Sequence, residues 1–427
     1  MPTGYGPAVL DLAIVAGVLA VVAAIRHLIE DLPVTAPMLY VAAGVLLGPD
    51  ALSVLEIELE SETVAILAEL TLAVLLFSDA SRIDVRRLRP SIGLPARLLG
   101  IGLPLTIALG TVLTALLLTE LSWAEAALIA AVLAPTDAAL GEAVVSNEAV
   151  PLRVRQALNV ESGLNDGMVV PAVTIFLSMA IGGELDGPGS LAVEALTEIG
   201  VGVIAGAAIA FALTRVAMLA MERHWTDSEG LRLLMLGGAL VAFAGSTAAG
   251  GNGFIAAFVC GLLVRAFMGE PVDTQTELAE DVAQIGATAT FVLFGAVLVW
   301  PAFDALTPLV AVCAIATLTI GRMVPVAISL IGSGLEPTTV AFIGWFGPRG
   351  LASMVFGLLV IQEEALVGRE QLFAVIVLVI VASVVLHGLS AGPLAVRYGH
   401  WFDLHGNHDM EEAVEVEAPM LRGERRP

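Results

Sequence analysis

Long apolar stretches alternate with short polar segments along almost the whole chain. A bilayer-spanning helix needs about 20 mostly apolar residues, so this alternation is typical of a membrane protein with many spans. The pattern predicts an all-α fold with about thirteen transmembrane helices. Their ranges are roughly 8–26, 33–49, 63–80, 93–118, 123–147, 155–182, 190–221, 230–249, 252–268, 276–300, 304–333, 338–362 and 370–397.

Two of the predicted spans are interrupted in the middle by proline and glycine. The fifth contains Ala134-Pro135-Thr136-Asp137, and the twelfth contains the stretch from Gly344 to Gly350. Transporters built from inverted repeats place their site where one helix of each half is broken. If spans 1–6 and 8–13 are the two halves and span 7 links them, the two broken helices correspond. We therefore expect two inverted six-helix repeats in which discontinuous helices 5 and 12 cross.

The composition agrees with a membrane protein and narrows its partners. Apolar residues make up 58% of the 427 residues and charged residues only 14%, whereas a soluble domain carries roughly 25% charged residues. All 19 basic residues are arginine, and the net charge is −23. Such an acidic surface favours a salt-adapted (halophile) source, because salt screens the repulsion between the acidic charges. Codon bias toward arginine is the alternative explanation of this composition. Nucleic acid is not an expected partner.

The sixth span carries polar residues that lipid would not solvate. Glu161, Ser162, Asn165 and Asp166 lie close together in an otherwise apolar stretch. Residues four apart share a helix face, so these side chains occupy neighbouring strips. A charge buried in a membrane must face a cavity, an ion or a countercharge. The pattern predicts an ion and proton site at Asp166; a helix–helix hydrogen bond is the alternative.

The interrupted fifth span is expected to complete this site. Hard monovalent cations are held by oxygen, and Asp137, the freed carbonyl of Thr136 and the hydroxyl of Ser162 would join Asp166 as ligands of Na⁺. A single carboxylate holds either a cation or a proton, and that competition alone makes an exchanger. Desolvation also moves the proton affinity of a buried carboxylate toward the working pH.

Two arginines inside the spans need partners of their own. Arg322 in span 11 is expected to pair with Glu161, because an unpaired guanidinium within a bilayer is costly. Arg349 is expected to face Asp137 or the negative end of the broken helix. A place at the cytoplasmic mouth is the alternative for Arg349.

Glu69 and His387 are the remaining ionisable residues singled out within spans. Glu69 would gate the ion path or assist proton entry, with a polar contact between spans as the alternative. His387 is expected to be a hydrogen-bonded packing residue, although a pH sensor stays open. Asp79 and the neighbouring arginines are interpreted as interface and topology signals.

The arginines between spans predict the orientation, since positive charge gathers on the cytoplasmic side. With the N-terminus outside, the outward connections contain only Arg369. The inward arginines are Arg26, Arg82, Arg86, Arg87, Arg89, Arg153, Arg155, Arg223, Arg232, Arg265, Arg397, Arg422, Arg425 and Arg426. We expect a multi-pass protein of the plasma (cell) membrane, with a transmembrane domain at 1–399 and a short acidic cytoplasmic tail at 400–427. No signal peptide is expected.

The sequence resembles the monovalent cation:proton antiporter-1 family, which includes the NhaP antiporters and the sodium–hydrogen exchangers. Four motifs in order carry the resemblance: Ala134 to Asp137, Arg153 to Asp166, Arg322, and Phe346 to Ser353. It covers spans 3 to 13. One departure is Ala138, where many relatives have proline.

The resemblance implies a homodimer that works by elevator-like alternating access. The mobile core would be spans 4–6 and 11–13 (about 93–182 and 304–397). Spans 1–3 and 8–10 (about 8–80 and 230–300) would form the dimer side, with span 7 (about 190–221) as linker. In the family pattern Asp166, Thr136, Asp137 and Ser162 bind the ion, Glu161, Asn165 and Arg322 support them, and Glu69 lies at the cytoplasmic funnel. No cofactor is implied beyond the transported ions.

The stoichiometry follows from one position. Electrogenic relatives of this site have a second aspartate at the equivalent of Asn165, and an amide cannot carry a proton. The sequence therefore predicts electroneutral sodium/proton antiport, one Na⁺ or Li⁺ per H⁺, serving sodium transport and pH homeostasis. Potassium/proton antiport by the same fold is the alternative, because oxygen ligands suit both ions.

Other classes are disfavoured by what the chain lacks. No selectivity filter supports a cation channel, and no nucleophile or metal constellation supports an enzyme. The tail has no Gly-rich fingerprint for a nucleotide. We expect a secondary active transporter.

Overall fold

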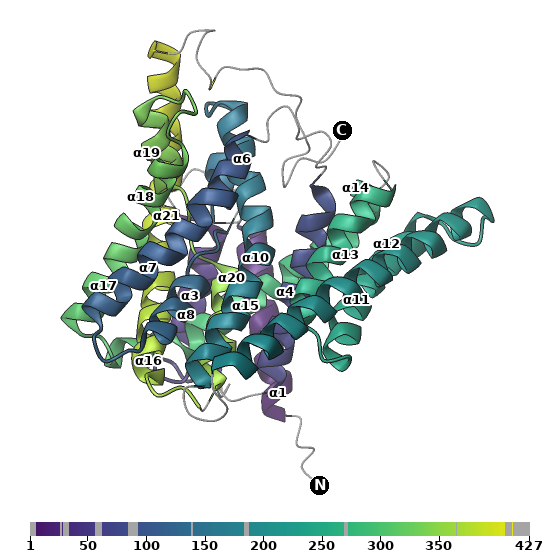
Figure 1. Cartoon of the computed structure of the whole chain (residues 1–427), viewed down its shortest axis with the longest axis horizontal. Coiled ribbons are helices and arrows are strands. Elements are labelled where there is room, and N and C mark those ends of the chain that lie inside the picture. Colours follow the sequence, from purple (N-terminus) through teal and green to yellow (C-terminus); the bar gives the residue numbers. More distant parts are fainter. Residues whose placement is uncertain are drawn as a thin grey trace.

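The computed structural model describes residues 6–25, 28, 34–55, 62–83, 93–137, 140–182, 188–268, 272–363, 365–405 and 412. Within these ranges every regular element is a helix, as predicted (Figure 1). The first ten are α1 (Gly6–Ala24), α3 (Ala36–Leu47), α4 (Glu62–Arg82), α6 (Gly93–Arg97), η1 (Leu98–Gly102), α7 (Leu103–Leu117), α8 (Trp123–Val132), α9 (Glu142–Val145), α10 (Leu152–Ile181) and α11 (Pro188–Glu222).

The second half of the chain continues in the same way. Its helices are α12 (Ser228–Ala248), α13 (Gly253–Met268), α14 (Val272–Gln275), α15 (Glu277–Val297), α16 (Val299–Asp304), α17 (Pro308–Leu318), α18 (Ile320–Ser329), α19 (Pro337–Trp345), α20 (Leu351–Gln362) and α21 (Arg369–His405). Each predicted range overlaps at least one of these helices.

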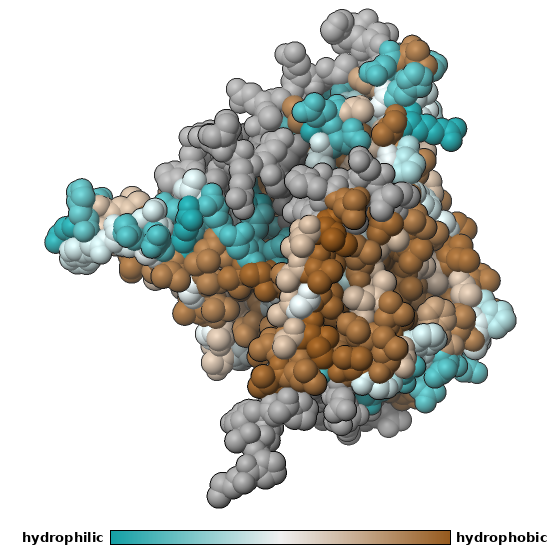
Figure 2. Space-filling model, turned by 180° about the vertical axis from the view of Figure 1, so that it is seen from behind, coloured by the Kyte–Doolittle hydropathy of each residue, from teal (hydrophilic) through white to brown (hydrophobic). Residues whose placement is uncertain are grey.

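Six stretches of the described chain are long and apolar enough to cross a bilayer unaided. They are Gly93–Leu117, Leu152–Ile181, Val193–Glu222, Ser228–Ala248, Pro308–Ser329 and Arg369–His405. Shorter apolar helices accompany them, among them α3, α8, α13 and α20. Figure 2 shows the outcome on one face, where a hydrophobic band lies between hydrophilic ends. Such a band matches the apolar interior of a bilayer.

The two predicted interruptions are present. Helix α8 begins at a capping box in which Ser122 and Glu125 bond each other's backbone N–H, and it ends at Val132, before Pro135. Residues 133–137 are not helical, and the same holds for residues 346–350 between α19 and α20. Pro135 and Pro348 lack the N–H that a helix interior needs, so both helices stop before them.

The last span is longer than predicted. We expected it to end near residue 397 and the tail to begin at 400, but α21 continues to His405. Tyr398 is buried and stacks on Phe342 of α19, with ring centroids 4.1 Å apart. Packing on a neighbouring helix thus extends α21 beyond its apolar stretch.

The helices form two packed groups. In one, α3, α4 and α15 pack together, and α13 packs on α4, α11 and α12. In the other, α8 lies against α7 and α10, α17 packs on α7 and α21, α18 packs on α7 and α19, and α20 packs on α21. Figure 1 shows α11 to α14 on one side of the molecule and α7, α17, α18 and α19 on the other.

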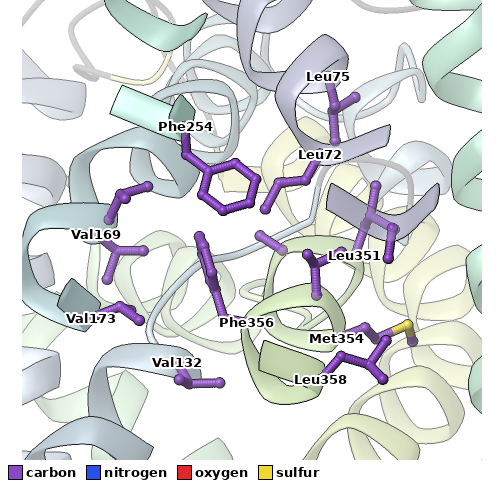
Figure 3. Packing of buried hydrophobic residues seen from close by; sticks show 14 of the residues in the cluster. Leu72, Leu75, Val132, Val169, Val173, Phe254, Leu351, Met354, Phe356 and Leu358 are labelled. Carbon is purple, nitrogen blue, oxygen red and sulfur yellow. The ribbon is translucent and has the colours of Figure 1, made fainter. Parts of the chain in front are cut away.

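An apolar seam joins the two groups. Leu72 and Leu75 of α4 and Phe254 of α13 meet Val169 and Val173 of α10 and several side chains of α20 (Figure 3). Phe254 and Phe356 contact edge to face, with centroids 5.9 Å apart. The two groups therefore meet here through buried apolar side chains.

Some sequence-based expectations fall outside the described residues. These are the topology arginines Arg26, Arg86, Arg87, Arg89, Arg422, Arg425 and Arg426, the departure at Ala138, and the tail from residue 406 onward apart from Glu412.

Candidate functional site

The two interruptions contact each other directly. The backbone N–H of Asp137 donates to the carbonyl of Pro348 over 2.8 Å. The Asp137 side chain then accepts, through Oδ2, a 2.9 Å hydrogen bond from the N–H of Leu351, the first residue of α20. A carboxylate at a helix N-terminus satisfies an orphan donor and complements the helix dipole. Asp137 therefore ties the fifth span to the outgoing half of the twelfth.

Gly350 makes this contact sterically feasible. A Cβ added at Gly350 would overlap the carboxylate of Asp137. We expect Gly350→Ala to slow ion exchange about tenfold or more, because overpacking costs about 1–3 kcal/mol and would displace Asp137.

The matched control for this prediction is Gly344→Ala on the incoming half-helix. A Cβ there would lie 3.4 Å from Met323 Cα, an ordinary contact. Exchange rates of the two variants in vesicles, at equal protein, test the expectation. Equal rates would show that the Asp137 contact does not matter.

A chain of hydrogen bonds connects the fifth and sixth spans beside Asp137. The Asn165 amide Nδ2 donates to Thr136 Oγ1 over 2.7 Å, and Thr136 Oγ1 lies 2.9 Å from Ser162 Oγ. Because Thr136 accepts from Asn165, its own hydroxyl hydrogen is available for Ser162. Three residues that the sequence singled out therefore meet in one place.

The oxygens here suit a hard cation. Asn165 is 1% exposed, and its Oδ1 has no hydrogen-bond partner among the described residues. Asp166, the next residue on α10, is 6% exposed. Buried oxygens beside unwound backbone are what transporters use to hold Na⁺ or H⁺. Among described residues no group of three His, Cys, Asp or Glu side chains could hold a metal ion, so hydroxyl, amide and carbonyl oxygens would have to contribute.

Glu161 and Arg322 form a two-pronged ion pair across α10 and α18. Arg322 Nη1 lies 2.6 Å from Glu161 Oε1, and Nη2 lies 2.8 Å from Oε2. Both side chains are 2% exposed. Parallel N–H···O bonds of this kind fix geometry as well as charge. Gly347 lies against the guanidinium, and a Cβ there would come within 2.5 Å of Arg322 Nε.

Arg349 is completely buried at the crossing. Its Nη1 donates to the carbonyls of Ala134 and Pro135 at 3.3 Å and to that of Gly347 at 3.1 Å. These carbonyls include the freed end of α8, where the negative end of the helix dipole lies. Arg349 thus lies at the negative end of the broken helix, as expected, and its complete burial does not fit the alternative position at the cytoplasmic mouth.

His387 of α21 contacts the end of α19, next to the same interruption. The carbonyl of Trp345 lies 2.9 Å from His387 Nε2 and only accepts, so Nε2 carries the hydrogen. Ser383 Oγ lies 3.1 Å from Nδ1 and accepts from the Arg349 N–H over 2.6 Å. The histidine is thus hydrogen-bonded through Nε2 to the end of α19 and through Nδ1 to Ser383 of its own helix, as a packing residue would be.

The structure places Glu69 in the first half of α4. It lies half-buried on α4, seven residues after that helix begins, and Asp79 lies ten residues further on. With the N-terminus outside, the Arg82 end of α4 faces inward, so Glu69 belongs to the outer half. The placement of Glu69 at the cytoplasmic funnel, which the family resemblance implies, stays a prediction.

Asp79 is the residue that sequence reasoning passed over. Its Cβ would be 3.9 Å from a Cβ at Gly163, less than one turn of α10 before Asp166. The acidic side chain thus lies beside the site on the opposite helix group. A signal was present in the sequence, a carboxylate at the end of an apolar span, but the nearby arginines suggested a topology role.

Comparisons with known proteins place this arrangement in context. The family model described as sodium/hydrogen exchanger, transmembrane, matches residues 17–397. The chain is 25% identical over 389 residues to the K(+)/H(+) antiporter NhaP of Alkalimonas amylolytica, covering 90% of this chain and 66% of that relative. It is 24% identical over 360 residues to the K(+)/H(+) antiporter NhaP2 of Shewanella sp. (strain MR-4), covering 83% and 61%. The chain spans slightly less than two thirds of these relatives.

A solved structure shares the fold. The sodium proton antiporter MjNhaP1 of Methanocaldococcus jannaschii, at pH 8, superposes with a TM-score of 0.74 and 19% sequence identity. The match covers 89% of this chain and 99% of that one. Since the family match runs over nearly all of the helical chain, this multi-pass membrane protein belongs to the sodium/hydrogen exchanger family.

Proposed function

We propose that the protein exchanges a monovalent cation for a proton, with both competing for Asp166. The observation that carries the proposal is the place of this carboxylate. Asp166 is buried on α10 directly after Asn165, whose amide is bonded to Thr136 at the crossing of the two broken helices. A buried carboxylate within a bilayer faces a cavity, an ion or a countercharge, and beside unwound backbone it is suited to holding a cation or a proton.

The surrounding residues divide the work. Asp166 holds the cation or the proton, and Asp137, Thr136 and Ser162 add oxygens. The hydroxyls of Thr136 and Ser162 already bond each other, so their oxygens lie together before a cation arrives. The Glu161–Arg322 pair and Arg349 hold the interrupted backbone, and their charges do not take part in exchange.

Sodium, with lithium, is the proposed cation, and potassium is the alternative. The relatives from Alkalimonas and Shewanella are named potassium antiporters, whereas the structural neighbour is named a sodium antiporter. The test is proton flux in vesicles that contain purified protein and an internal pH dye, with Na⁺, Li⁺ or K⁺ added in turn. The ion that drives proton movement identifies the substrate, and no response to any of them would overturn the proposal.

Exchange is proposed to be electroneutral, because only Asp166 carries a proton while its neighbour Asn165 carries none. The expected result is that cation-driven proton flux is unchanged when the membrane potential is clamped to zero, and that no current accompanies it. Solid-supported-membrane recording checks this. A steady transport current from the wild-type protein would contradict one-for-one exchange.

Asp166 is proposed to be reached from the side on which α10 begins. Ser162 and Gly163, before Asp166, are partly exposed, and so is Asp79 across from them. Val169 and Val173, after Asp166, are buried in the apolar seam (Figure 3). With the N-terminus outside, the open side is cytoplasmic, and the structure would represent the inward-facing state.

The two helix groups support an elevator mechanism within a homodimer. The mobile core would comprise spans 4–6 and 11–13, and spans 1–3 and 8–10 would form the dimer side. Helices α10 and α20 carry the site and contact α4 and α13 across the seam. Movement along the seam would break few polar contacts; one of them is the 3.0 Å bond from Asn252 to Thr174. Inverted repeats of thirteen spans remain part of this proposal.

A further inference from the structure

A pocket of about 320 Å³ lies between α19 and α21, toward the end at which α21 stops. Its volume falls in the range of ligand pockets, roughly 300–1,000 Å³. None of its lining residues is a proposed ion ligand. They are Thr338, Ala341, Phe342, Trp345, Phe346, Leu394, Arg397, Tyr398 and Trp401.

The walls of the pocket are rigid and apolar. Tyr398 stacks between Phe342 and Trp401, with centroids 4.1 and 5.7 Å away. Two polar ring atoms in the lining already have partners: Tyr398 Oη lies 2.9 Å from Thr339 Oγ1, and Trp345 Nε1 donates to Ser390 over 3.0 Å. The rings therefore offer an occupant flat apolar surface rather than hydrogen bonds.

The depth of the pocket can be judged along α21. His387 bonds the interrupted helix, which lies near the bilayer midplane in transporters of this architecture. Arg397 follows ten residues later, about 15 Å along a helix axis. Half the hydrocarbon thickness is also about 15 Å, so the pocket crosses the boundary between acyl chains and headgroups.

Arg397 is the charged member of the lining among the described residues, and its side chain is exposed. An exposed guanidinium at this depth binds phosphate strongly, and aromatic rings beside it are typical of membrane interfaces. We propose that this pocket binds an anionic phospholipid. Its acyl chain would lie against Tyr398 and Trp401, and its phosphate would bond Arg397.

The competing occupant is the chain's own acidic tail. Glu412 accepts a 2.8 Å hydrogen bond from the N–H of Glu336, two residues before Thr338 in the pocket wall. Acidic side chains of the tail would pair with the Arg397 guanidinium in place of a phosphate. The apolar walls favour a lipid, because an acyl chain would cover the ring faces.

The test measures lipid binding to the purified full-length protein by native mass spectrometry in detergent. Phosphatidylglycerol is the anionic probe and phosphatidylcholine the neutral one. The wild type is expected to retain phosphatidylglycerol preferentially. Arg397→Gln should weaken that binding about fivefold, the effect of one basic residue at an anionic surface, and leave phosphatidylcholine unchanged. Ala341→Trp, which fills the pocket from the lipid side, should reduce both.

The matched control is Arg232→Gln on α12, away from the pocket, where the guanidinium is already paired with Glu277; this variant should bind lipid like the wild type. Thermal unfolding in detergent alone shows that each variant is folded. Equal retention of the two lipids by the wild type, or equal effects of Arg397→Gln and Arg232→Gln, would overturn the proposal. So would a protein that selects phosphatidylglycerol only after residues 407–427 are removed, since the tail would then be the occupant.

Discussion

Replacing Asp166 by asparagine is expected to abolish cation-driven proton flux, with residual exchange at least about a hundredfold below the wild type. The substitution keeps the shape and removes both the charge and the exchangeable proton. A buried cation that loses its charged partner loses about 3–5 kcal/mol, and each 1.4 kcal/mol is a factor of about ten. Exchange is measured in vesicles with an internal pH dye, using the cation that drives the wild type.

A second aspartate separates this effect from a general loss of acidic charge. Asp304 lies exposed at the end of α16, outside the site, and Asp304→Asn should exchange at the wild-type rate. Both variants should elute as folded protein and unfold at similar temperatures. Undiminished exchange by Asp166→Asn would mean that another carboxylate carries the proton, and Asp137 and Glu161 would be replaced next.

Breaking the Glu161–Arg322 pair is expected to have the largest effect on stability. Glu161→Gln leaves a fully buried guanidinium without its carboxylate, which costs about 3–5 kcal/mol. Arg349, also completely buried, lies within electrostatic range of both partners. Without Glu161 two buried cations would face each other, so Glu161→Gln should destabilise the protein more than Arg322→Met does. Thermal unfolding in detergent and the yield of folded protein report the loss.

The double variant Glu161→Gln, Arg322→Met distinguishes a specific pair from general sensitivity of the core. Replacing a whole buried ion pair with uncharged groups is often close to neutral, whereas removing one partner is not. We expect the double variant to recover most of the stability that Glu161→Gln loses. Losses that simply add would show that the two residues do not depend on each other.

Much of the fold could be predicted from local sequence. Apolar stretches located the helices along the chain, because lipid admits only helices whose backbone is internally bonded. Pro135 and Pro348 marked the interruptions, since proline lacks the N–H that a helix needs. The end of α21 could not be predicted in this way, because Tyr398 and Trp401 continue the helix by packing on α19 and on each other.

The candidate site was predictable in its members but not in all its contacts. Polar residues in spans are few, so Asp166, Asn165 and Glu161 stood out, and Arg322 was the natural partner for Glu161. The structure then decided that Arg349 bonds backbone carbonyls and that Asp137 caps α20. Such contacts depend on the rotation and depth of each helix, which apolar periodicity does not specify in lipid.

The sequence by itself determined that this is a helical membrane protein with buried acidic chemistry in its sixth span and interruptions in two helices. Those features can be inferred without tertiary contacts, because a bilayer solvates neither charged side chains nor unpaired backbone N–H and C=O groups. Only the tertiary structure placed Asp79 beside α10, brought the Asp137 carboxylate to the first turn of α20 and formed a pocket beside Arg397. Each of these depends on which helices are neighbours and at what height they meet, because the chemical character of a side chain does not reveal what lies across from it.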